Sequence, residues 1–79
     1  MNINTTYKTS SLPLATFLSI HQPILDIDRE SPARALFVFD QNQELEHLIT
    51  DYWSGKTLVE PQTYFNQLKI VKARLYDNS

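Results

Sequence analysis

The segment Arg34-Ala35-Leu36-Phe37-Val38-Phe39 decides how this chain folds, because its aromatic and branched side chains suit the pleated surface of a β-sheet. Directly after it, residues 40–54 carry apolar side chains at spacings of three and four, which indicates a helix with one buried face. Gly55 follows, where helices commonly end in a left-handed residue. The sequence therefore predicts a strand that leads directly into a helix.

A shorter apolar segment, residues 24–29, precedes this strand, and residues 30–33 between the two are turn-forming. We therefore predict a β-hairpin. The side chains expected to face inward are Leu25, Ile27, Ala35, Phe37 and Phe39. Leu36 and Val38 fall on the opposite face, and a two-stranded ribbon also has two unpaired edges. Either the first helix or a second copy of the chain must cover them.

Helices are predicted at three places, each from a capping residue or a proline followed by helical apolar spacing. The expected spans are residues 12–20 after Ser10 or Ser11, residues 40–54 after Asp40 or Asn42, and residues 61–76 after Glu60. The side chains expected to face the core are Leu14, Phe17 and Leu18 in the first helix, Leu45, Leu48, Ile49 and Tyr52 in the second, and Tyr64, Phe65, Leu68, Val71 and Leu75 in the third. Pro23 ends the first helix, because the residue before a proline is pushed out of the α region.

The predicted fold is a small single α+β domain with the element order α-β-β-α-α, in which a two-stranded β-hairpin packs against three helices. The domain is expected to span residues 7–77 and to follow a disordered tail of residues 1–6. A chain of 79 residues builds only a small core, so self-association would supplement its stability. We therefore expect a homodimer.

Composition limits the chemistry that is available. The absence of cysteine removes disulfides and thiolate metal sites, and it favours a reducing cytoplasmic compartment. No segment is apolar enough for a signal peptide or a membrane span. The net charge of −2 is unlike that of a protein held mainly by phosphate contacts, although the part from Lys56 onward is basic.

The chain resembles a family of small bacterial and phage-associated domains of unknown function. The residues that carry the resemblance are Tyr7-Lys8-Thr9-Ser10, Phe37-Val38-Phe39-Asp40, Glu44-Leu45-Glu46, Asp51-Tyr52-Trp53, Gly55-Lys56, Leu58-Val59, Pro61, Tyr64-Phe65, Leu68, Lys72 and Leu75-Tyr76. The family pattern often has a glycine after the first helix, where this chain has His21-Gln22-Pro23. The resemblance implies a compact αββαα domain and no established activity.

No arrangement of polar residues resembles a known catalytic site, so we expect a protein that is not an enzyme and that holds no metal or cofactor. His47 lies opposite the apolar face of its helix, and His21 lies at a helix C-terminus, where the helix dipole favours an imidazolium. Asp26 and Asp28 share one side of a strand, but two carboxylates are too few for a dedicated cation site. We expect them to form a solvent-facing acidic stripe.

The leading functional hypothesis is an interaction module that binds a second copy of itself, or another protein, through the hairpin. The candidate interface residues are Ile24, Leu36, Val38, Trp53 and Ile70. Trp53 lies at the margin of a buried helical face, so core packing and interface use both remain open for it. The alternative is a nucleic-acid-associated accessory protein. Its candidate contacts are Lys56, Lys69, Lys72 and Arg74.

Overall fold

The computed structural model describes residues 6–29 and 34–77. The elements in chain order are β1 (Thr6–Thr9), α1 (Leu12–His21), β2 (Asp26–Asp28), β3 (Leu36–Asp40), α2 (Gln43–Ser54) and α3 (Pro61–Tyr76). The predicted α+β class and the antiparallel pairing of β2 with β3 are both confirmed. The expected turn at residues 30–33 and most of the expected tail lie outside the described residues.

The sheet has three strands rather than two, in the order β1-β3-β2. Strand β1 was missing from the sequence prediction, which placed Thr6 in the tail and treated the following residues as the approach to a helix. In the structure β1 pairs antiparallel with β3, from Thr6 opposite Asp40 to Thr9 opposite Phe37. The correct order is therefore β-α-β-β-α-α. A short polar segment carries no alternation of its own, so only the presence of β3 identifies it as a strand.

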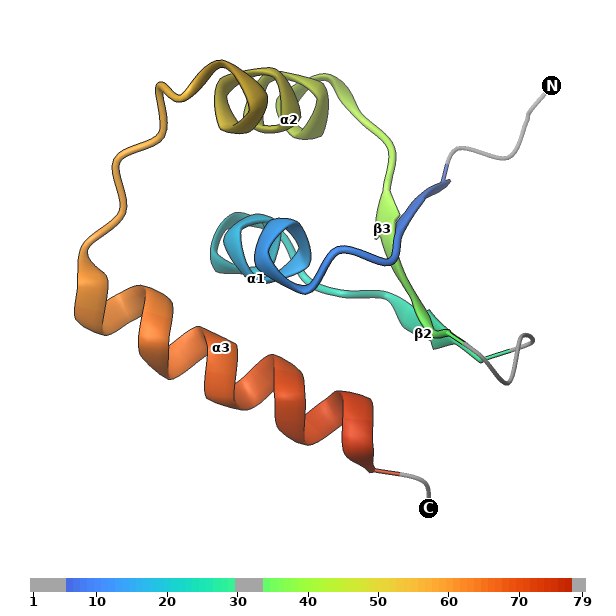
Figure 1. The fold of residues 1–79 in the computed structure, drawn as a ribbon. Helices are drawn as coiled ribbons and strands as arrows, with labels where there is room; N and C mark the ends of the chain where they lie inside the picture. The colour runs from blue at the N-terminus through green and yellow to red at the C-terminus, as the bar shows by residue number, and fades with distance from the viewer. Residues whose placement is uncertain (1–5, 30–33, 78–79) are drawn as a thin grey trace, which may run out of the picture.

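Helix α1 lies at the centre of the molecule, with α2 and α3 on opposite sides of it and the sheet on a third (Figure 1). This position explains why five consecutive residues, Leu14 to Leu18, are buried instead of a single face. Thr16 is fully buried among them, and its hydroxyl donates a hydrogen bond to the carbonyl of Leu12 at 2.8 Å. A helix enclosed on three sides has no polar face over its buried part.

The core is formed where α1 meets the sheet and the two other helices. Its buried members are Leu14, Ala15, Phe17, Leu18, Ile24, Phe37, Phe39, Leu45 and Val71. Phe37 and Phe39 point to the same face of β3, because alternate residues of a strand share a face. Both were predicted to face inward, and both are buried.

The helix boundaries follow the local signals. Ser11 is the N-cap of α1 and accepts a hydrogen bond from the N–H of Leu14, and Asn42 caps α2 in the same way through Leu45. Gly55 ends α2 with φ of 75°, a left-handed conformation that favours glycine. These caps confirm the predicted starts and end.

Two side chains that were expected to face the core are exposed. Leu25 was expected to face inward and is 52% exposed, while Phe65 of α3 is 60% exposed. Leu25 lies before the first residue of β2, so the two-residue period of a strand does not yet apply to it. Phe65 lies at the edge of the buried stripe of α3, and α1, as a single neighbouring helix, covers only a narrow stripe.

Candidate interaction surfaces

The polar residues that could have formed a catalytic or metal site are spread over the structure. His21 is exposed and its ring meets Phe17 edge-on, with centroids 5.3 Å apart. His47 lies on the outer side of α2, in a shallow hollow lined by Gln43, Glu46, His47 and Thr50. Within residues 6–29 and 34–77, no three His, Cys, Asp or Glu side chains come together as a metal-binding group.

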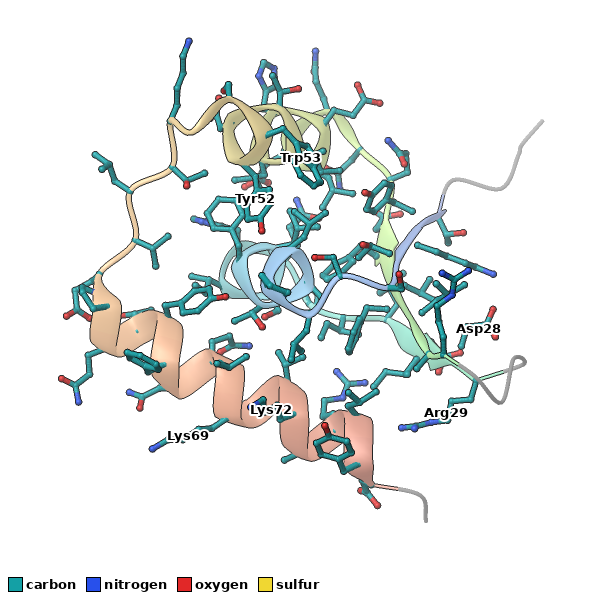
Figure 2. All side chains as sticks on the ribbon, viewed as in Figure 1. Asp28, Arg29, Tyr52, Trp53, Lys69 and Lys72 are labelled. Carbon is teal, nitrogen blue, oxygen red and sulfur yellow. The ribbon has the colours of Figure 1, made fainter. Side chains whose placement is uncertain are left out.

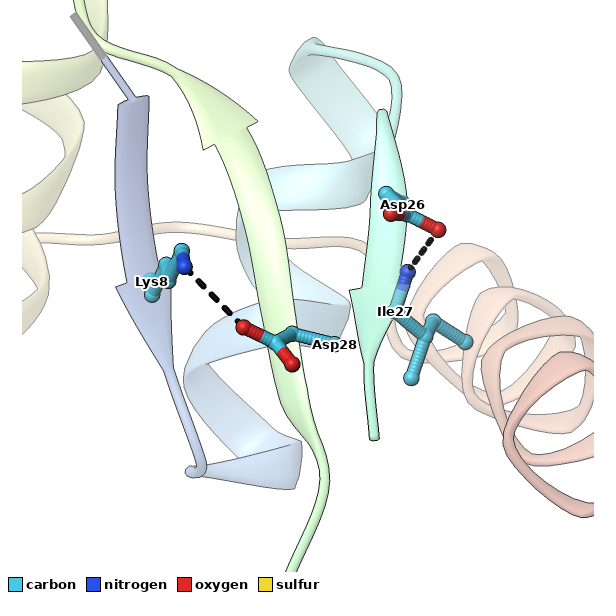
Figure 3. Close-up of polar contacts among 4 residues, drawn as sticks. All are labelled: Lys8, Asp26, Ile27 and Asp28. Carbon is cyan, nitrogen blue, oxygen red and sulfur yellow. Dashed lines mark hydrogen bonds and ion pairs between the residues drawn. The ribbon is translucent and has the colours of Figure 1, made fainter. Parts of the chain in front are cut away.

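The two aspartates of β2 make local structural contacts. Asp26 accepts a hydrogen bond from the N–H of Ile27 at 2.8 Å, and Asp28 forms a 3.0 Å ion pair with Lys8 of β1. Figure 3 shows this ion pair crossing β3, the strand that separates β1 from β2. In the register Lys8 pairs with Val38 and Asp28 pairs with Leu36, so both charges lie on the face of the sheet opposite to Phe37 and Phe39. One of the two predicted acidic charges, that of Asp28, is therefore paired with a lysine, which the sequence analysis did not predict.

The five predicted interface residues do not form one patch. Ile24 and Val38 are buried, each at 8% exposure, so the expectation that they offer free surface is wrong. The Lys8–Asp28 pair on the same face contributes to covering Val38, and Ile24 packs into the core. Leu36 is half-buried. A third strand and a cross-sheet ion pair were absent from the sequence prediction, which left the cover of this face to either the first helix or a second copy.

Trp53 and Ile70 are the two interface candidates with exposed side chains, at 69% and 53%. They lie on α2 and α3, which are on opposite sides of α1, so they belong to different surfaces (Figure 1). Trp53 meets Tyr52 edge-on, with ring centroids 5.1 Å apart, and Tyr52 in turn contacts Phe17 of α1 at 5.9 Å. The indole is thus exposed but supported from below. Core packing, the other reading of Trp53, is wrong.

The same ring of Tyr52 also influences α3. Burial raises the pKa of Tyr64, and the neighbouring Tyr52 raises it further. Tyr64 meets Phe65 edge-on at 6.5 Å. The end of α2 and the start of α3 thus each carry a pair of aromatic rings in contact, and the hydroxyl groups of Tyr52 and Tyr64 interact electrostatically.

The four basic residues that were candidates for nucleic-acid contacts do not form one surface either. Arg74 is exposed, but its guanidinium donates a hydrogen bond to the carbonyl of Ile24 at 3.3 Å, so part of its bonding capacity is used within the fold. Lys56 is exposed just after α2, whereas Lys69 and Lys72 are exposed on α3. Figure 2 shows Lys69 extending from α3 away from α1. Only two of the four, Lys69 and Lys72, share a helix and are free to meet a ligand.

One structural contact of the fold was not predicted from the sequence. Arg29, directly after β2, donates hydrogen bonds to the carbonyls of Leu75, Arg74 and Asp77 at 2.7, 2.9 and 3.2 Å. These are carbonyl groups at the end of α3, where helices leave acceptors without internal partners. No local pattern could have revealed this contact, because its partners are more than forty positions away.

Within the described part of the chain, none of the helices combines the length and the apolar content that a bilayer crossing requires.

A protein-family model matches residues 4–77, which is nearly the whole chain. No curated protein and no solved structure matches the sequence. The expected membership of a family of unknown function is thus confirmed by the family match, and its bacterial and phage association stays a prediction.

Proposed function

Since this chain belongs to the DUF5659 family, a domain of unknown function, we propose its role from its surfaces: a non-enzymatic protein-interaction module that self-associates, with Trp53 at the centre of the contact. The observation that carries this proposal is the exposure of the Trp53 indole, 69% of which is accessible to solvent. Tryptophan is among the residues most enriched at the energetic centres of protein interfaces.

The support beneath Trp53 strengthens the proposal. Its ring rests edge-on against Tyr52, which packs on Phe17 in the core. A side chain that is already held in place loses less conformational entropy when a partner covers it. Trp53 can therefore act as a rigid anchor rather than as a mobile surface residue.

The size of the domain favours a second copy as the partner. The accessible surface is 5360 Å², and a standard interface covers about 800 Å² on each partner. A dimer would thus remove about 15% of this surface from water, which is a large addition to what a small core buries.

The predicted hairpin contact is less well supported than the Trp53 contact. Ile24 and Val38 are covered within one copy, and the ion pair of Lys8 and Asp28 crosses the outer face of the sheet. Strands β1 and β2 each pair only with β3 among the described residues, so an edge-to-edge contact is the alternative route to a dimer.

The test is sedimentation equilibrium of the full chain and of two variants, from low to high micromolar concentration. We expect the wild type to dimerise and Trp53→Ala to weaken the dimer by about tenfold or more. Leu58→Ala is the matched control, because Leu58 is 98% exposed and apolar but lies outside α2, and it should leave the dimer unchanged. A wild type that is monomeric throughout would refute self-association, and equal effects of both variants would refute the role of Trp53.

A further inference from the structure

Four exposed side chains of α3 lie in one row along the helix. Phe65, Lys69, Lys72 and Tyr76 are separated by four, three and four residues, so at about 100° per residue they fall within about 60° of one another. They span about 16 Å along the helix axis. We name this row the α3 stripe. Its order is aromatic, cation, cation, aromatic.

Every member of the α3 stripe is open to solvent. Phe65 is 60% exposed and Tyr76 is 70% exposed, and both lysines are exposed as well. Within the described residues, neither lysine is held in an ion pair. The stripe lies about a quarter of a turn away from the residues of α3 that pack on α1, so the core does not use it.

The two ends of the stripe are held in place by the fold. Phe65 rests edge-on against Tyr64, which is partly buried. Tyr76 is the last residue of α3, and Arg29 binds carbonyls on either side of it, those of Leu75 and Asp77. The spacing between the backbone positions that carry the two rings is thus set by a helix whose end is fixed.

The charge of α3 differs from that of the other helices. Helix α3 contains three cations and no carboxylate, while α2 carries Glu44, Glu46 and Asp51 on the opposite side of the molecule. Arg74 is exposed too, but it donates a hydrogen bond to the carbonyl of Ile24, so within the described residues the two stripe lysines are the cations of α3 that are not engaged by the fold. The stripe therefore suits a polyanion even though the whole chain is slightly acidic.

We propose that the α3 stripe binds single-stranded nucleic acid, with Lys69 and Lys72 contacting phosphates while Phe65 and Tyr76 stack on unpaired bases. Aromatic rings interleaved with cations are the usual means by which proteins hold single strands without reading their sequence. A duplex hides its base faces, so it would leave both rings unused. This surface is separate from the Trp53 contact and does not depend on it.

A lipid surface fits the stripe less well than a single strand does. Helices that lie in a membrane interface insert a broad apolar face, and the apolar face of α3 is packed against α1. Only two rings would remain for insertion. The chemistry of the stripe does not distinguish DNA from RNA, because phosphates and base faces are common to both.

The test is fluorescence anisotropy of labelled oligo(dT) and oligo(U), with a duplex of the same length and with phosphatidylserine vesicles as competitors, using the full chain. We expect both single strands to bind at low salt and the duplex and the vesicles to compete poorly. Two phosphate contacts on a single strand predict a slope of about −1.4 for the logarithm of affinity against the logarithm of salt concentration. Preference for one of the two oligonucleotides would identify the natural strand.

Variants of the stripe separate charge from stacking. Lys69→Gln with Lys72→Gln should lower affinity about tenfold or more and bring the salt slope close to zero. Phe65→Ala or Tyr76→Ala should lower affinity about tenfold and leave the slope unchanged. Lys56→Gln and Leu58→Ala are the matched controls, since they remove an exposed cation and an exposed apolar side chain outside the stripe.

Three outcomes would overturn the proposal: no binding of either oligonucleotide by a folded wild type at low salt, equal losses from Lys56→Gln and from the stripe lysines, or stronger binding to the vesicles or the duplex than to single strands. Trp53→Ala should leave oligonucleotide binding unchanged, and the stripe variants should leave dimerisation unchanged. Failure of this proposal can therefore be told apart from failure of the Trp53 contact.

Discussion

Glu60 shows at the scale of one residue how the chain uses charge to begin a helix. Its carboxylate accepts hydrogen bonds from the N–H and the hydroxyl of Thr63, at 2.8 and 3.0 Å. The bond from the backbone of Thr63 is the main cause of a lowered pKa of Glu60, followed by the backbone of Gln62 and the Thr63 side chain. The charged form of Glu60 is therefore the form that caps α3.

This capping predicts a dependence of stability on acid pH. Because the pKa of Glu60 is lower in the folded chain than in the unfolded chain, its contribution is complete above the unfolded pKa and is lost as the pH falls through the folded pKa. Urea unfolding of wild type and Glu60→Gln should give a difference in free energy that is largest near neutral pH and shrinks in acid. Thr63→Ala is the companion variant, and an NMR titration should show it raising the pKa of Glu60. A difference that stays constant with pH would contradict this role.

At the scale of elements, single long side chains tie segments that are distant in the sequence. Gln22, the C-cap of α1, and Asn42, the N-cap of α2, exchange amide hydrogen bonds at 3.3 and 3.1 Å. Gln67 of α3 donates to Ser19 of α1 at 3.0 Å. The ends and sides of the helices are thus positioned by polar contacts as well as by the core.

The contact of Arg29 with the end of α3 predicts a local effect on that helix. Arg29→Gln removes a cation from the negative end of the helix and leaves carbonyls without their donor, so we expect a loss of about 1 kcal/mol in unfolding free energy. Hydrogen exchange should speed up in the last turn of α3 more than elsewhere. Arg34→Gln is the control, since Arg34 is an exposed arginine shortly before β3. Equal effects of both changes on α3 would argue against the cap.

At the scale of the whole molecule, stability depends on a few side chains that join the helices to the sheet. Leu45 is the buried residue of α2 and is fully inaccessible to solvent, and it belongs to the same cluster as the buried residues of α1 and β3. Domains of this kind are stable by only about 5 to 15 kcal/mol. The loss of one anchor is therefore a large fraction of the total.

We expect Leu45→Ala to lower the free energy of unfolding by about 3 kcal/mol, since the cavity adds to the lost burial. Leu58→Ala removes the same atoms from a side chain that is 98% exposed and should change stability by less than about 0.5 kcal/mol. Urea unfolding of both variants measures the difference. Similar values for the two would mean that α2 is not anchored through Leu45.

The sequence by itself determined the features that depend on residues three or four positions apart. The predicted helix ends are found at Ser11, Asn42 and Gly55, because a cap acts through the nearest backbone groups. The pairing of the two hairpin strands was also predictable, since few residues separate them. Partners that are close in the sequence meet without help from the rest of the fold.

Only the tertiary structure decided which side chains remain exposed. Strand β1 became a strand because β3 was available to pair with it, and that pairing together with the Lys8–Asp28 ion pair covered a face that the sequence left open. Phe65 and Trp53 are exposed because each lies at the edge of the apolar face of its helix. The element packed on that face covers its middle but does not reach the edge. The α3 stripe is exposed for the same reason, because α1 covers only one side of α3. Exposure depends on what lies across from a residue, and in this chain those neighbours are far away in sequence.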